Sequence, residues 1–111
     1  MKKDPAIFLK HISESIKFIE SFSKRLTKEK FIKNRMRQNA IVRELEIIGE
    51  AVKNLSSEFM EKHKGIPWSD IARTRDKLIH HYFGVDLNEV WDIIKEDLPK
   101  LKKQIQEILK S

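Results

Sequence analysis

Residues 75–82 place an arginine, an aspartate, two adjacent histidines and the chain's only tyrosine within eight positions, in the order R-D-K-L-I-H-H-Y. A guanidinium offers fixed hydrogen-bond donors to phosphoryl or carboxylate oxygens. An imidazole titrates near neutral pH and can take or supply a proton. These residue types could support acid–base chemistry on a phosphate ester. They could equally form a structural cluster in which Arg75 and His80 are partners of Asp76.

The spacing limits which of these side chains can meet on a helix. Arg75 and Tyr82 are seven residues apart and nearly eclipse, two turns from each other. Asp76 and His80 are i,i+4 neighbours, so the carboxylate can orient the imidazole. Arg75 and His80 diverge by about 140° around an ideal helix. They can share one site only if the helix frays near His80 or a second copy of the chain completes the site.

A single helix is predicted over this stretch, from an N-cap at Ser69 or Asp70 to a closing glycine at Gly84. Apolar residues at Ile71 and Leu78 fall on one face at helical spacing. The corner before it, residues 66–68, contains a proline, and Trp68 is predicted to anchor it in the core.

The remaining chain predicts an all-α fold, an antiparallel four-helix bundle with an additional short helix, in a single domain over residues 1–111. The first helix starts at Asp4-Pro5 and ends near Arg25, and a short turn passes through Phe31 and Ile32. A central helix from about Asn34 to Leu55 has the apolar seam Ile41, Leu45, Ile48, Val52 and Leu55. A short helix starts at Ser56, and the last helix follows an N-cap at Asp86, with a kink or restart around Asp97-Leu98 caused by Pro99.

Two features of the central helix are expected to matter for packing. Gly49 weakens the helix and predicts the close approach of another backbone. Arg43, Glu46 and Glu50 line a polar side, where they either pair among themselves or lie beside the helix of residues 69–84.

The net charge is +6, and residues 24–37 contain seven basic residues against Glu29 alone, which equals the whole excess. Such a patch attracts phosphate backbones, although it could also be a solvated connection between helices. The candidates for contact with a nucleic-acid backbone are Lys28, Lys30, Lys33, Arg35 and Arg37. The chain has no cysteine, no apolar run long enough to span a bilayer and no zinc-site spacing, so we expect a cytoplasmic protein without a metal or other cofactor.

The pattern R-x-x-x-x-H-x-Y at Arg75 to Tyr82 resembles the signature of the HEPN superfamily, specifically its HepT-type toxins. Three flanking segments agree with it: L-E-I-I-G-E-A-V from Leu45, I-P-W from Ile66, and V-W-x-I-I-x-x-D-L-P from Val90.

The resemblance implies a HEPN-like helical bundle, a two-fold homodimer and metal-independent RNA cleavage as the toxin of a HepT/MntA toxin–antitoxin module. Arg75 and His80 then form the catalytic pair, with Asp76 supporting them. Tyr82 becomes the side chain to which an MntA-type nucleotidyltransferase antitoxin adds AMP; otherwise it is an ordinary packing residue. The alternative is an inactive HEPN binding module that docks a nucleotidyltransferase or a nucleotide.

Overall fold

The computed structural model describes residues 4–80 and 85–110, the side chains of Ile79 and His80 excepted. The described chain is all-α. Its helices are α1 (Pro5–Ser23), α2 (Lys28–Lys33), α3 (Arg35–Lys53), α4 (Ser57–Lys62), α5 (Trp68–His80), α6 (Leu87–Asp92), the π-helical segment η1 (Ile93–Asp97) and α7 (Leu98–Lys110). None of the helices described is both long and apolar enough to cross a membrane.

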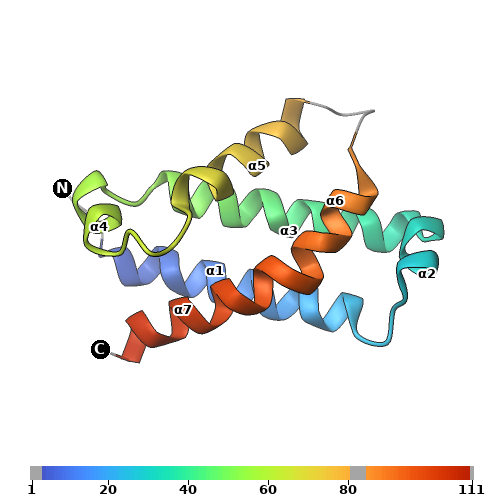
Figure 1. Ribbon diagram of the computed structural model, residues 1–111, viewed down its shortest axis with the longest axis horizontal. Helices are drawn as coiled ribbons and strands as arrows, with labels where there is room; N and C mark the ends of the chain where they lie inside the picture. Colours follow the sequence, from blue (N-terminus) through green and yellow to red (C-terminus); the bar gives the residue numbers. More distant parts are fainter. Residues whose placement is uncertain (1–3, 81–84, 111) are drawn as a thin grey trace.

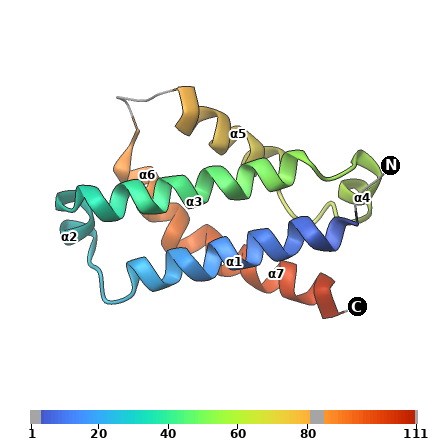
Figure 2. The same cartoon turned by 180° about the vertical axis from the view of Figure 1, so that it is seen from behind.

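Four long helical segments run antiparallel to their neighbours, as predicted (Figure 1). Helix α3 lies between α1 and α5 and packs against both, and α7 packs on α1. The start of α1 and the end of α7 lie at the same end of the bundle as α4, whereas α2 lies at the opposite end (Figures 1 and 2). This arrangement makes α3 the support on which α5 rests.

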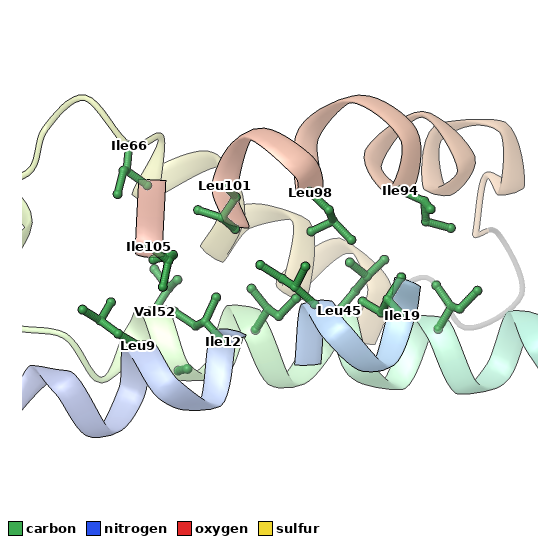
Figure 3. Close-up of a cluster of buried hydrophobic side chains, with 14 of the residues drawn as sticks. Leu9, Ile12, Ile19, Leu45, Val52, Ile66, Ile94, Leu98, Leu101 and Ile105 are labelled. Carbon is green, nitrogen blue, oxygen red and sulfur yellow. The ribbon is translucent and has the colours of Figure 1, made fainter. Parts of the chain in front are cut away.

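The core lies between α1, α3 and the η1–α7 segment (Figure 3). The predicted seam of α3 is buried throughout, at Ile41, Leu45, Ile48, Val52 and Leu55. Because each helix presents an apolar stripe at intervals of three and four residues, the stripes of three elements meet in one cluster.

Two of the predicted caps are confirmed, at the starts of α1 and α6. The Asp4 carboxylate accepts a hydrogen bond from the Ala6 N–H at 2.9 Å, ahead of Pro5 at the first helical position. The Asp86 carboxylate accepts from the N–H groups of Asn88 and Glu89. Helix α1 ends at Ser23, two residues before Arg25, which adopts a positive φ of 63° and so turns the chain.

Helix α5 starts earlier than expected. The prediction of an N-cap at Ser69 or Asp70 is wrong, because Trp68 is already helical. The Trp68 side chain is buried, and its indole N–H donates to the carbonyl of His63 at 3.0 Å. The burial of Trp68 therefore determines where the first turn of α5 begins. Gly84, which was predicted to close this helix, lies outside the described residues.

The C-terminal segment changes helix type where the kink or restart was predicted. Residues Ile93–Asp97 form a π-helical turn, in which the Leu98 N–H bonds to the Ile93 carbonyl five residues back. Pro99 follows directly and has no N–H to donate to a carbonyl one turn earlier. The widened turn lies next to the residue that disrupts the regular bonding.

Candidate functional site

Arg75 lies on the face of α5 that packs against α3, and its guanidinium lies between two carboxylates. Its Nη2 is 2.9 Å from a carboxylate oxygen of Glu50 on α3, and its Nη1 is 3.1 Å from Asp76 Oδ1. The Arg75 side chain is 24% exposed, so its stem is covered while its head reaches solvent. Its Nε is buried and has no acceptor among the side chains that the structure describes.

Asp76 connects Arg75 to a second cation on α3. The Lys53 ammonium donates to the same Asp76 oxygen that accepts from Arg75. These hydrogen bonds, that from Lys53 first and that from Arg75 second, lower the pKa of Asp76 below its ordinary value. The result is an alternating row of charges, Glu50, Arg75, Asp76 and Lys53, across the α3–α5 contact.

His80 is the last residue of α5, and only its backbone is described. The predicted contact between Asp76 and His80, and the predicted site of modification at Tyr82, lie outside the described part of the chain. The backbone remains helical through His80. Positions 75 and 80 are therefore separated by about 140° around the helix axis.

A cleft of about 300 Å³ opens beside Arg75. Its walls include Glu50 and Arg43 from α3 and Phe8 and His11 from α1. Arg43 pairs with Glu46 at 3.4 Å, as one reading of the sequence expected, but Glu50 pairs with Arg75. His11 is exposed in this cleft.

The contribution of Lys53 was missed. Lys53 and Glu50 are three residues apart and so share a face of α3, which is a signal that the sequence contains. Their partners on α5 are more than twenty residues away, and only the packing of α5 on α3 reveals them.

The basic residues of the segment 28–37 lie on α2 and in the first turn of α3. This is the opposite end of α3 from Glu50. Lys28, Lys30 and Arg35 are exposed, and Lys33 is 3.5 Å from Glu29. Arg37 differs from them, because its Nη1 donates to the Phe22 carbonyl at 2.6 Å and is partly buried. At about 1.5 Å per helical residue, Arg35 lies roughly 20 Å along α3 from the level of Arg75.

A family model described as "Ribonuclease HepT-like" matches residues 12–108. Relatives of this chain include "Probable ribonuclease HepT" of Thermococcus cleftensis, 44% identical, with 99% of this chain and 100% of the relative covered. "Putative RNase TTE0752" of Caldanaerobacter subterraneus is 49% identical, with 96% of each chain covered.

A third relative, "Gamma-glutamylcyclotransferase and putative RNase MJ0434" of Methanocaldococcus jannaschii, is 50% identical over 98% of this chain. The chain spans about half of that relative, 49% of its length. No solved structure matches the chain.

The helical bundle and the Arg75 motif on α5 define a HEPN-type domain. The match over residues 12–108 makes the assignment more specific: the chain belongs to the HepT-like family.

Proposed function

We propose that this protein is a metal-independent endoribonuclease, the toxin of a HepT/MntA-type toxin–antitoxin module, in which Arg75 and His80 carry the chemistry. The observation that supports this most is the placement of Arg75. Its stem is covered by α3, its head reaches solvent, and it is presented by α5, the helix that also contains position 80 of the R-x-x-x-x-H-x-Y motif.

In the proposed reaction the 2′-hydroxyl of RNA attacks the adjacent phosphorus. The O2′–P bond forms as the P–O5′ bond breaks, leaving a cyclic phosphate and a free 5′-hydroxyl. His80 takes the proton from the 2′-hydroxyl or supplies one to the leaving oxygen, a contribution of roughly 10²–10⁴-fold.

Arg75 would stabilise the charge that grows on the phosphoryl oxygens. A guanidinium has five N–H donors. Asp76 accepts a hydrogen bond from Nη1, and Glu50 forms an ion pair with Nη2. Each Nη therefore retains a second N–H that a phosphoryl oxygen can accept.

The site is proposed to be completed by a second copy of the chain. Acid–base catalysis benefits from two imidazoles, whereas one motif supplies one at position 80. Since α5 is helical through His80, positions 75 and 80 face different directions. A two-fold dimer brings the Arg75 of one copy towards the motif histidine of the other.

The central experiment incubates purified protein with RNA in the presence of a chelator. We expect cleavage by the wild-type protein and none by His80→Ala or Arg75→Ala. His63→Ala is the matched control: the His63 ring packs at a tilt against Phe59, with centroids 4.6 Å apart, and its loss should leave cleavage unchanged. Mixing the two inactive variants should partly restore cleavage if the site is shared between copies, and a mixture that stays inactive contradicts the shared site.

Regulation is proposed to act through Tyr82. Adding AMP there would introduce an anion seven residues after Arg75 in the same motif, and an anion that reaches Arg75 would compete with substrate phosphate and repel RNA. Tyr82→Phe should keep ribonuclease activity and become insensitive to the nucleotidyltransferase. A Tyr82→Phe protein that is still silenced, with its mass increased by AMP, shows that the modified residue lies elsewhere.

The second candidate function is an inactive module that docks the nucleotidyltransferase or a nucleotide. The pairing of Arg75 with two carboxylates favours it, because the guanidinium charge is already balanced. A folded protein, unmodified at Tyr82, that cleaves none of a broad set of RNAs and still binds the nucleotidyltransferase would establish this alternative.

A further inference from the structure

Gly49 lies where α3 meets α5, and as a glycine it contributes no side chain to this contact. A Cβ placed on Gly49 would overlap the Cβ of Arg75 and would lie 2.7 Å from its Cγ and 3.4 Å from its Cα. Distances below 3.0 Å between such atoms are essentially never observed. The stem of Arg75 therefore rests directly on the backbone of α3, at the position where the sequence predicted a close approach.

The next residue, Glu50, holds the other end of the same side chain. Its carboxylate is 2.9 Å from Arg75 Nη2. Gly49 thus fixes where the Arg75 side chain begins, and Glu50 fixes the orientation of the guanidinium. Asp76 contributes at Nη1, but it belongs to α5 and moves with Arg75.

We infer that Gly49 and Glu50 are positioning residues for Arg75: α3, rather than α5 alone, determines where the guanidinium meets the substrate phosphate. This inference rests on the proposed function and adds two residues to it. Neither residue needs to touch RNA, because both act through Arg75.

The packing part of the inference can be tested without any substrate. Alanine is normally a better helix residue than glycine, so Gly49→Ala should raise the melting temperature if space allows. We expect it to lower the melting temperature instead, in the wild-type and in an Arg75→Ala background, because alanine retains the overlapping Cβ. In an Arg75→Gly background the overlap is absent, and Gly49→Ala should raise the melting temperature.

Gly65→Ala is the matched control for the glycine substitution. A Cβ added at Gly65 meets no atom within 4 Å, so its effect should be independent of residue 75. If Gly49→Ala changes the melting temperature equally in all three backgrounds, Arg75 is not what Gly49 accommodates and the inference is wrong.

The functional part is measured as kcat and KM for RNA cleavage. A displacement of about 1 Å at a reacting group can cost about 10²-fold in rate, so Gly49→Ala should lower kcat by about that factor while the fold is retained. Glu50→Gln should lower kcat by about tenfold and leave KM nearly unchanged, because it loosens Arg75 without removing it. Glu61→Gln, which removes an exposed ion pair with Lys64 outside the Arg75 cleft, should leave both constants unchanged.

The outcomes separate this inference from the proposed function. A wild-type protein that cleaves RNA, with Gly49→Ala and Glu50→Gln variants of unchanged kcat, overturns the positioning roles and leaves the ribonuclease in place. A wild-type protein that cleaves no RNA refutes the proposed function. The packing of Arg75 on Gly49 is then judged by the melting temperatures alone.

Discussion

Phe31 is expected to hold the basic helix α2 on the bundle. It is the buried residue of this six-residue helix, with 0% of its surface exposed. Its ring centroid is 5.4 Å from that of Trp91 on α6. Replacing a buried phenylalanine by alanine typically costs about 3–5 kcal/mol. Because α2 is short and can partly settle into the space, we expect a loss of about 3 kcal/mol for Phe31→Ala.

Denaturant unfolding followed by tryptophan fluorescence measures this loss, since Trp91 reports on the contact directly. Phe31→Leu keeps most of the apolar volume and should cost less than about 1.5 kcal/mol. The neighbouring residue provides the control: Ile32 is 42% exposed, and Ile32→Ala should change stability by no more than about 0.5 kcal/mol. If Phe31→Ala costs less than about 1 kcal/mol, the ring does not anchor α2 and the reasoning fails.

Three further outcomes are expected. Replacing Lys28, Lys30 and Lys33 by glutamine should weaken RNA binding and flatten its salt dependence while kcat is retained; unchanged affinity and salt slope would make the segment a solvated connection. Asp76→Asn should be less stable than wild type at neutral pH. Because the pKa of Asp76 is lowered by Lys53 and Arg75, that difference should shrink as the pH falls below 3.8, and a difference that stays constant in melting curves from pH 7 to pH 2 would contradict it. Ser56→Ala removes the acceptor for the Phe59 N–H and should cost about 1 kcal/mol in denaturant unfolding, whereas no loss would mean that this cap is not needed.

The parts of the fold that depend on local patterns could be predicted. The seam of α3 and the caps at Asp4 and Asp86 follow from the spacing of apolar residues and from N-cap chemistry. The start of α5 could not be predicted in this way, because Trp68 joins the helix through its burial and its bond to the His63 carbonyl. Such a contact depends on where two separate segments pack.

The candidate site shows the same difference between local sequence patterns and contacts that depend on packing. Arg75 and Asp76 were identified from the motif, because neighbouring residues stay together in any fold. Their partners were not, since Glu50 and Lys53 meet them only when α5 packs on α3. Arg37 also has a partner that the sequence did not reveal: its Nη1 donates to the Phe22 carbonyl of the chain itself.

The π-helical turn at Ile93–Asp97 also affects how this segment tolerates insertions and deletions. Val90, Ile94 and Leu98 are all buried, although each lies four residues after the previous one. In a regular α-helix each step of four residues overshoots a full turn by about 40°, so two such steps would rotate Leu98 away from the core.

A π turn contains more residues than an α turn and absorbs that rotation, so it acts as a one-residue insertion within an otherwise continuous helix. Deleting one residue between Ile93 and Asp97 would restore the regular α-helical period. Pro99 would then fall inside an uninterrupted α-helix, where a proline is poorly tolerated. The extra residue and Pro99 are therefore expected to be gained or lost together in this part of the chain.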